Sequence, residues 1–454
     1  MTRFLFASVP AAGHVTPGLP LARSLVERGH DVFWYTGERF RSAVEASGAV
    51  FVPMRANRDF DHARIDDEFP GRAQLQGLAQ LQFDMMHLFI DAAYGCVLDL
   101  EAFLEEQPVD VLVNDVGCLG IPMLSERTGI PFATYGVSIL PMPSRDTAPF
   151  GLAIAPSSTP LGRLRNHTLN WAMENVLFRQ VGQHYRATRA RLGLSVRNRG
   201  FFAAAGNAPY LYLQAGLESF EYPRSDLPPT LHFCGPFVPP PSADFTPPAW
   251  WPELQAARAV VHVTQGTFTT GSEDLIVPTL RALADEDVLV IATTGGKPVE
   301  SVALDPLPAN ARVERFIPHA QLLPHVHVMI TNAGYGGVQT ALAHGVPLVA
   351  AGTTEDKPEV ARRIAWSGVG IDLRTRRPTA EQIRRAVREI LTQDTYRTRA
   401  RAMQREIAAF SATARASDLL EQLAATRMPV IAQRTRPSQS HSRWRPEART
   451  LLSR

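Results

Sequence analysis

Cysteine is scarce in this chain of 454 residues. The three cysteines, Cys96, Cys118 and Cys234, are widely separated and show no spacing typical of metal ligands. A sparse, odd-numbered set argues against a disulfide framework and is typical of proteins from reducing compartments. The net charge is also small, at +2, and gives no argument for a nucleic-acid partner.

Long hydrophobic runs are missing as well. A membrane-spanning helix needs about 18 apolar residues without a charge, and no such stretch occurs. The apolar run at 4–9 follows Arg3 in the manner of a signal peptide. It is too short for one, however, and Pro10 and His14 interrupt its continuation. We therefore expect a cytoplasmic protein that does not span a membrane.

What is present is an ordinary globular composition, with 45% hydrophobic and 20% charged residues. More than one domain is expected, because single hydrophobic cores stop growing at about 250–300 residues. The N-terminal segment predicts a βαβ unit. A strand is expected at 4–9, a helix at 17–28 that ends before Gly29, and a second strand at 31–35. Such a unit implies a parallel sheet with a right-handed crossover.

The same alternation recurs on both sides of a proline-rich stretch. Residues 223–252 contain ten prolines, a density that no helix or strand tolerates, and they are the predicted linker. Before the linker we expect strands at 109–114 and 131–135 and helices at 74–105, 120–128 and 161–192. After it we expect strands at 259–264, 288–293, 328–331 and 347–351, with helices at 272–284, 336–344, 381–391 and 396–424.

This pattern predicts an α/β fold with two doubly wound, Rossmann-like domains. The expected boundaries are 1–222 for the first domain, 223–252 for the linker and 253–425 for the second domain. Six arginines opposed only by Glu447 occupy 433–454. Residues 426–454 are therefore expected to form a basic, disordered tail, to which we assign no function.

Two residues next to the first and third expected strands are candidates for catalysis, since ligands of open α/β sheets bind at the carboxyl ends of the strands. His14 lies in the turn after the strand at 4–9 and could take a proton from a hydroxyl at neutral pH. Asp115 follows the strand at 109–114 and could orient and charge-stabilise this histidine. As structural alternatives, His14 could cap a turn, and Asp115 could be an ordinary helix N-cap.

A glycine-rich loop at 331–338 lies between a strand and a helix of the second domain. Its glycines Gly334, Gly336 and Gly337 would let the backbone approach a pyrophosphate, and the helix N-terminus supplies partial positive charge. Tight packing is the alternative explanation. The loop is neither a P-loop nor the G-x-G-x-x-G dinucleotide fingerprint. A Rossmann dehydrogenase is disfavoured because no glycine-rich fingerprint with an acidic residue follows the first expected strand.

Together these segments resemble the family of inverting GT-B nucleotide-sugar glycosyltransferases. That family includes the bacterial macrolide and antibiotic glycosyltransferases and the UDP-glucosyl- and UDP-glucuronosyltransferases. The resemblance spans about residues 3–420. It is carried by 12–17, 19–22 and 29–32 near the N-terminus, and by 316–319, Gly334, 345–347 and Asp356 in the second half.

The resemblance implies a GT-B fold, with the acceptor in the first domain, the donor in the second and a cleft between them. His14 matches the catalytic base and Asp115 the acid that orients it. The implied reaction moves a hexose from a UDP- or TDP-sugar to a hydroxyl of a small hydrophobic acceptor, with inversion of configuration. A helix N-terminus, rather than a metal, would stabilise the leaving diphosphate. The donor-binding positions implied by the family are Gly266, Thr267, Phe316, Ile317, His319, Asn332, Gly334, Gly336, Gly337, Val338, Thr340, Asp356 and Lys357.

Within this set, Phe316 would stack on the nucleotide base and Asp356 would bond hydroxyls of the donor sugar. The chain also departs from the family pattern. Asn332 replaces a histidine, Gly337 a serine or threonine, Thr340 a glutamate, and His319 and Lys357 each a glutamine.

The departure at Lys357 has two explanations. Its charge could compensate for the missing phosphate histidine or bind a carboxylated sugar. Alternatively, it could form an ion pair with Glu355 or Glu359. The altered positions also keep two other functions open: a catalytically silent accessory protein that binds a sugar nucleotide, and a sugar-nucleotide epimerase on the same fold.

The acceptor region is less well marked. Residues 83–94 are apolar and rich in methionine, and such surfaces suit large hydrophobic ligands. Phe83, Met86 and His87 are the candidate acceptor contacts. The same residues could equally be the core of a helix.

Overall fold

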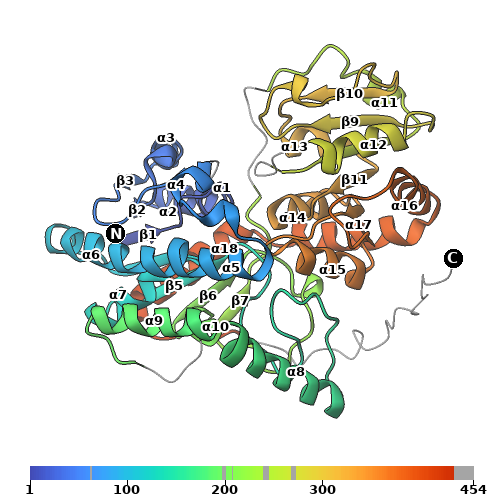
Figure 1. Ribbon diagram of the computed structural model, residues 1–454. Coiled ribbons are helices and arrows are strands. Elements are labelled where there is room, and N and C mark those ends of the chain that lie inside the picture. The colour runs from blue at the N-terminus through green and yellow to red at the C-terminus, as the bar shows by residue number, and fades with distance from the viewer. Residues whose placement is uncertain (62–63, 197–200, 207, 239–244, 267–271, 434–454) are drawn as a thin grey trace.

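In the computed structural model, the described residues form two α/β units that lie side by side (Figure 1). These residues are 1–61, 64–196, 201–206, 208–238, 245–266 and 272–433. Each unit is built around a sheet in which every pairing of neighbouring strands is parallel. This is the α/β architecture with two Rossmann-like domains that the sequence predicts.

The first sheet has seven strands in the order β3-β2-β1-β4-β5-β6-β7. Helices cover both of its faces, so its central strands are buried on both sides. Leu5 and Leu112 pack into the hydrophobic cluster on one face, whereas Phe4 and Phe6 pack into the cluster on the other. Its strands are β1 (Arg3–Ala7), β2 (Asp31–Tyr35), β3 (Val50–Val52), β4 (Val111–Asp115), β5 (Phe132–Gly136), β6 (Leu211–Gln214) and β7 (Leu231–Phe233).

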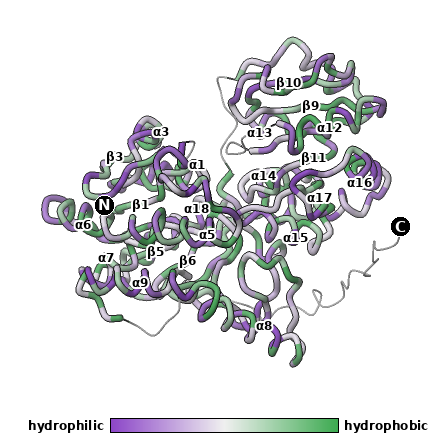
Figure 2. Tube along the Cα trace, in the orientation of Figure 1, coloured by the Kyte–Doolittle hydropathy of each residue, from purple (hydrophilic) through white to green (hydrophobic). Residues whose placement is uncertain are grey.

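The second sheet has six strands in the order β10-β9-β8-β11-β12-β13. Its central strands consist mainly of branched apolar residues, and Figure 2 shows β9 as a hydrophobic segment. Clusters of buried residues again lie on both faces. The strands are β8 (Val260–Thr264), β9 (Leu289–Thr293), β10 (Ala311–Glu314), β11 (Val328–Thr331), β12 (Leu348–Ala350) and β13 (Gly370–Asp372).

The helices begin and end where the local sequence provides caps. Gly129 and Gly368 stop α7 and α15 in the left-handed conformation, and Thr379 opens α16 with a reciprocal capping box. The helices of the first unit are α1 (Ala12–Val15), α2 (Leu19–Glu27), α3 (Arg41–Ala46), α4 (Ile65–Glu68), α5 (Gly77–Asp84), α6 (Asp91–Glu106), α7 (Gly120–Thr128), α8 (Pro160–Ala172), α9 (Arg179–Arg191) and α10 (Phe201–Ala205). Those that follow are α11 (Glu253–Ala256), α12 (Ile276–Ala282), α13 (His319–Leu322), α14 (Tyr335–Ala343), α15 (Lys357–Ser367), α16 (Ala380–Thr392), α17 (Asp394–Ala408) and α18 (Ala412–Thr426).

The long helical regions expected at 74–105 and 161–192 are each interrupted. A π-helix at Met85–Ile90 separates α5 from α6, and another at Met173–Leu177 separates α8 from α9. Short 3₁₀ helices lie at Thr16–Gly18, Glu38–Phe40, Arg72–Gln74, Glu218–Phe220, Ser272–Asp274, Val299–Ser301 and Leu323–His325.

The boundaries between the units differ from the predicted ones. Strand β7 lies within the predicted linker, 223–252, but pairs with β6, so the first unit extends at least to Phe233. Pro228 precedes this strand and Pro236 follows it, so neither proline interrupts its pairing. Downstream, the side chains of Trp250 and Trp251 pack against the core of the second unit.

The C-terminal helix α18 also departs from the prediction, which placed 253–425 in the second domain. It packs against α2, β4 and β6 of the first unit. Leu420 and Leu423 are buried in the first unit's core, which explains the return of the chain. The segment after α18 stays attached as well, because Val430 N donates to Tyr210 O and Ala432 N to Pro229 O. Part of the expected tail, 426–454, is therefore bonded to the first unit, and 434–454 lies outside the described residues.

Candidate active site

The strand order of the first sheet reverses between β1 and β4, and at such a switch point the loops at the carboxyl ends of the two strands diverge to leave room for a ligand. The chain after β1 turns at once into α1, which carries His14, and Asp115 is the last residue of β4. Ala7 and Asn114 are register partners in the two strands. The fold thereby brings together two residues that are 101 positions apart in the sequence.

His14 and Asp115 form a closely held pair. The His14 Nδ1 atom lies 2.5 Å from Asp115 Oδ1. The same carboxylate accepts hydrogen bonds from the backbone N–H of Gly117, at 2.7 Å, and from that of Val9, at 2.9 Å. The Asp115 side chain is 0% exposed and that of His14 is 25% exposed. The buried carboxylate therefore fixes the orientation of a partly exposed imidazole, whose second ring nitrogen, Nε2, can accept a proton.

The electrostatics of the pair suit a base that works near neutral pH. Burial alone would lower the pKa of His14, but the acidic neighbours, Asp115 foremost, together outweigh burial, and the pKa is raised above its ordinary value of 6.5. Asp356 and Glu355, which belong to the second unit, add smaller upward contributions. The backbone of His14 is fixed too, because the Tyr135 hydroxyl donates to its carbonyl oxygen at 3.0 Å.

The second sheet has its own switch point, between β8 and β11. Gly266 follows β8 with a φ of 74°, a conformation that favours glycine, and it lies beside the side chain of Asn332, which follows β11. The Asn332 amide donates to the Gln265 carbonyl. Gly334 precedes α14, and a Cβ added at Gly336 would meet nothing within 4 Å. The N-terminus of α14 thus offers backbone N–H groups at the edge where the sequence predicts the donor phosphates.

Polar side chains join the two units next to this region. The Ser138 hydroxyl, which follows β5, contacts the Asp356 carboxylate, which precedes α15. Burial raises the pKa of Asp356. Elsewhere at the junction, the Gln214 amide donates to the Tyr335 hydroxyl at 3.0 Å. Asp356 therefore lies at the junction with the first unit, where its charge reaches His14.

The structure also settles which partner Lys357 has. Its ammonium group pairs with the neighbouring Glu355 and lies 3.3 Å from the Thr354 hydroxyl. Glu359, the other candidate, instead accepts hydrogen bonds from Arg363 and from loop residues of the first unit. Of the explanations for this lysine, the local ion pair has direct geometric support.

The remaining predicted donor residues differ in whether their side chains are available to a donor. Phe316 is 67% exposed, so its ring is available for stacking. The side chains of Ile317 and Val338 are buried in the second core, so only their backbones remain available to a donor. The Thr340 hydroxyl is directed back to Gly336 O, at 2.8 Å.

The last three predicted donor positions are His319, Gly337 and Thr267. The imidazole of His319 packs against that of His262, and burial lowers its pKa to about 4, so it is a neutral group at physiological pH. A Cβ added at Gly337 would lie 3.9 Å from this ring. Thr267 lies outside the described residues.

The acceptor candidates occupy the predicted region but do not form one set of contacts. The rings of Phe83 and His87 pack together at 4.5 Å between centroids, and His87 pairs with Asp91 at 2.8 Å. Met86 packs against the first core. The ring beside His14 is that of Phe89, at 6.4 Å between centroids, and it comes from the π-helix at Met85–Ile90. A π-helix places side chains out of the usual helical register and is often found at functional sites.

Phe89 and Ser138 are residues of this region that sequence reasoning did not select. Phe89 lies inside the apolar run that was singled out, but only its contact with the His14 ring distinguishes it. Ser138 follows β5 at a strand's carboxyl end, which was an available signal.

Two absences hold for the part of the chain that the structure describes. No group of three or more histidine, cysteine or acidic side chains is arranged to hold a metal ion. Over the same residues, every helix is too short or too polar to cross a membrane.

Two facing α/β units with candidate groups at the switch point of each sheet define the class of GT-B proteins. The comparisons agree. Residues 278–423 match the family described as the C-terminal domain of erythromycin biosynthesis protein CIII-like proteins. The chain is 51% identical to 4'-demethylrebeccamycin synthase of Lentzea aerocolonigenes over 93% of this chain and 99% of that protein. It is 36% identical to UDP-glycosyltransferase 2 of Phaeomoniella chlamydospora over 93% and 95% of the two chains.

The solved structures give the same fold. A crystal structure of the calicheamicin glycosyltransferase superposes with a TM-score of 0.73 at 23% identity, covering 94% of this chain and 100% of that one. The chain belongs to the GT-B nucleotide-sugar glycosyltransferases, and it is a glycosyltransferase.

Proposed function

We propose that this glycosyltransferase moves a hexose from a UDP- or TDP-sugar to a hydroxyl of a small hydrophobic natural product, with inversion at the anomeric carbon and His14 as the general base. The observation that carries the proposal is the contact of His14 Nδ1 with the buried Asp115 carboxylate. It leaves Nε2 as the basic nitrogen of a partly exposed ring.

The proposed reaction is a single in-line displacement. The acceptor oxygen forms a bond to the anomeric carbon as the bond from that carbon to the diphosphate oxygen breaks. The acceptor's proton passes to His14 Nε2, and the Asp115 carboxylate stabilises the imidazolium that forms. Attack on the face opposite the leaving group inverts the configuration. Binding both substrates between the units makes the reaction effectively unimolecular.

The donor would be held by the second unit. Backbone N–H groups at the N-terminus of α14, where a Cβ added at Gly336 would meet nothing within 4 Å, would bind the diphosphate, which carries negative charge as it leaves. Phe316 would stack on the base, and Asp356 would bond hydroxyls of the sugar. The name of the fungal relative, UDP-glycosyltransferase 2, supports a nucleotide diphosphate donor.

The acceptor would lie in the first unit, against Phe89 and the apolar residues near it. The ring of Phe89 packs near that of His14, so an apolar molecule bound there would have its nucleophile close to the base. The name of the bacterial relative, 4'-demethylrebeccamycin synthase, supports a natural-product acceptor.

The test is release of nucleoside diphosphate from UDP-, TDP- and GDP-sugars, with and without a pool of hydrophobic alcohols and phenols. Wild type is compared with His14→Ala and with His167→Ala, a matched control on the exposed surface of α8. Acceptor-dependent release that only His14→Ala abolishes is the expected result, and product stereochemistry then tests inversion.

Other outcomes would contradict the proposal. Conversion of the donor without an acceptor would identify an epimerase. Donor binding without any release would favour an accessory protein. Release that His14→Ala leaves unchanged would exclude this residue as the base.

A further inference from the structure

Helix α8 is oriented with its apolar side outward. Successive turns of about 3.6 residues place positions 161, 164 and 171 on one side of the helix. The side chains at these positions, Leu161, Leu164 and Trp171, are 80%, 62% and 58% exposed. On the opposite side Gly162 is buried and Asn166 is 0% exposed. Amphipathic helices of globular proteins normally have the reverse arrangement, with the apolar side on the core.

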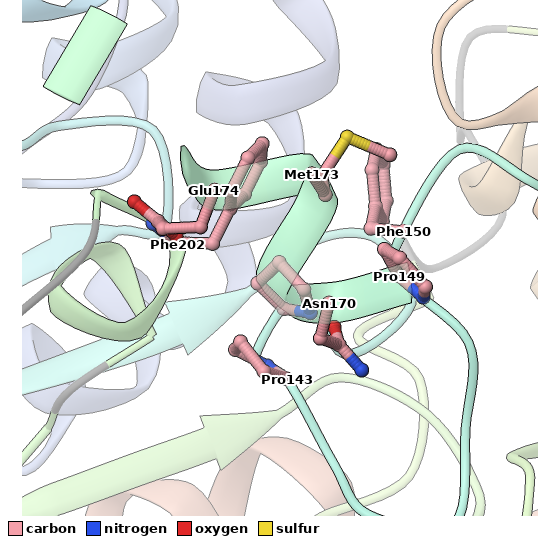
Figure 3. Close-up of a pocket in the computed structure, with 8 residues that line it drawn as sticks. Pro143, Pro149, Phe150, Asn170, Met173, Glu174 and Phe202 are labelled. Carbon is pink, nitrogen blue, oxygen red and sulfur yellow. The ribbon is translucent and has the colours of Figure 1, made fainter. Parts of the chain in front are cut away.

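The inner side of α8 is fully engaged, so the outward apolar side is not the result of a loosely packed helix. Asn166 and Asn170 donate to backbone carbonyls of the loop at 144–157. Asn170 also lines a small pocket, together with Met173, Glu174 and Phe202 (Figure 3). The helix is thereby fixed with its three large apolar residues facing away from the protein.

The exposed apolar surface continues past the end of the helix. Val176 and Leu177, in the following π-helix, are also exposed, by 61% and 41%. In Figure 1, α8 lies at the lower edge of the molecule. We define the α8 face as Leu161, Leu164, Trp171, Val176 and Leu177. An apolar surface of this kind at the periphery indicates an interaction site.

The segment that carries the α8 face is basic in sequence, with Arg163 paired to Asp146 and Arg189 to Glu126. Residues 147–217 contain eight arginines, no lysine and a single carboxylate, Glu174. That carboxylate is directed inward and accepts hydrogen bonds from the backbone N–H groups of Phe201 and Phe202. Arg165, His167 and Arg179 are exposed on the surface beside the α8 face. Because the net charge of the whole chain is only +2, this excess of positive charge belongs to the segment and not to the protein as a whole.

We propose that the α8 face docks on an anionic lipid surface, with the leucines and Trp171 in the interfacial layer and the arginines near the headgroups. An apolar stripe with tryptophan and leucine, flanked by cationic side chains, is the pattern of helices that lie in the plane of a membrane interface. Pairing with a second copy through the same face would oppose Arg165 and Arg179 to their own counterparts, and α8 contains no acidic residue to offset them. The inference does not depend on the proposed acceptor.

The test is co-sedimentation of the full chain with vesicles of phosphatidylcholine mixed with phosphatidylglycerol, beside vesicles of phosphatidylcholine alone. Binding to the mixed vesicles that weakens as salt is raised is expected. The double variant Leu164→Gln/Trp171→Gln should bind about tenfold more weakly or worse, because two large side chains lose their burial. Leu307→Gln, which removes an exposed leucine from the second unit, is the matched control and should bind like the wild type.

Three results would overturn the proposal: absence of binding to the mixed vesicles, binding that the double variant retains in full, or a dimer in light scattering that the double variant dissociates. The second would assign binding to another basic segment, and the third would assign the face to a second copy. Unchanged thermal unfolding of the double variant is expected, because its substituted side chains are exposed. Trp171 fluorescence that shifts to shorter wavelength on vesicle binding, and is lost in Trp171→Phe, would locate the contact.

Discussion

The substitution Asp115→Asn isolates the part of the proposed mechanism that depends on charge. Oδ1 of Asp115 accepts from both His14 and Gly117, whereas Oδ2 accepts only from Val9. An asparagine at this position has one side-chain oxygen, and it keeps two of the three hydrogen bonds when that oxygen takes the place of Oδ1. Its NH₂ group then takes the place of Oδ2 and faces the backbone N–H of Val9. In that orientation the imidazole keeps its tautomer and loses only the adjacent negative charge.

The expected losses follow from this orientation. The new side-chain NH₂ and the Val9 N–H are both buried donors without an acceptor, and this should lower the free energy of unfolding by about 1–3 kcal/mol. The rate should fall by about a hundredfold, at the lower end of the range of about 10² to 10⁴ for acid–base groups, because Nε2 remains the basic nitrogen. The Asp115 carboxylate is the largest upward influence on the His14 pKa, so its removal should lower that pKa.

The assay is the pH dependence of kcat/KM for nucleoside diphosphate release. A base with a raised pKa gains activity as the pH rises, so the acid limb of the wild type should lie above pH 6.5. The limb of Asp115→Asn should lie at lower pH than that of the wild type. The matched control is Asp146→Asn, another buried carboxylate, which bonds Arg163 and Ser225 instead. Coincident acid limbs in wild type and Asp115→Asn would refute the reasoning.

Three further predictions concern other parts of the molecule. Arg363→Met leaves the buried carboxylates of Glu221 and Glu359 unpaired and should cost about 3–5 kcal/mol in denaturant unfolding; a cost under about 1 kcal/mol would contradict the importance of this ion pair. Burial lowers the pKa of His262 to about 3, so as the pH drops this residue is protonated in the unfolded chain before it is protonated in the folded protein. The free energy of unfolding therefore falls as the pH drops from 6.5 toward 3. His262→Leu should reduce that slope by up to about 1.4 kcal/mol per pH unit, measured as unfolding free energy against pH, and an unchanged slope would show that His262 does not titrate as described. Lys357→Gln should change donor affinity by less than about twofold in titration calorimetry, because the lysine already pairs with a glutamate at the surface; a tenfold loss would instead establish charge recognition of the donor.

The centre of each sheet was predictable because its strands are continuous apolar runs. The runs at 31–35 and 328–331 correspond to β2 and β11 with the predicted bounds, as the helix at 120–128 does to α7. The strands that sequence reasoning missed include the edge strands β3 and β10, which are short and have exposed or half-buried residues. Such segments acquire strand geometry from their neighbours rather than from their own composition.

For the candidate site too, some residues could be selected from the sequence and some contacts could not. His14 and Asp115 could be selected because each adjoins a recognisable strand, and the strand order then brings them together. Contacts that cross between the units could not be read from local sequence. The contact of Ser138 with Asp356 joins positions 218 apart, and it exists only because the two units meet. The burial of Ile317 and Val338 likewise depends on tertiary packing, which a motif does not report.

The return of α18 to the first unit has a consequence for chimaeric enzymes. The chain passes between the units twice, once after β7 and again between α17 and α18. A hybrid made with one junction in the proline-rich stretch would give the first unit a foreign C-terminal helix, against which Ser24 and Arg28 must re-form their contacts with Ser417 and Asp418. Exchanging donor halves between relatives therefore calls for two junctions, with α18 kept alongside the half that contains His14.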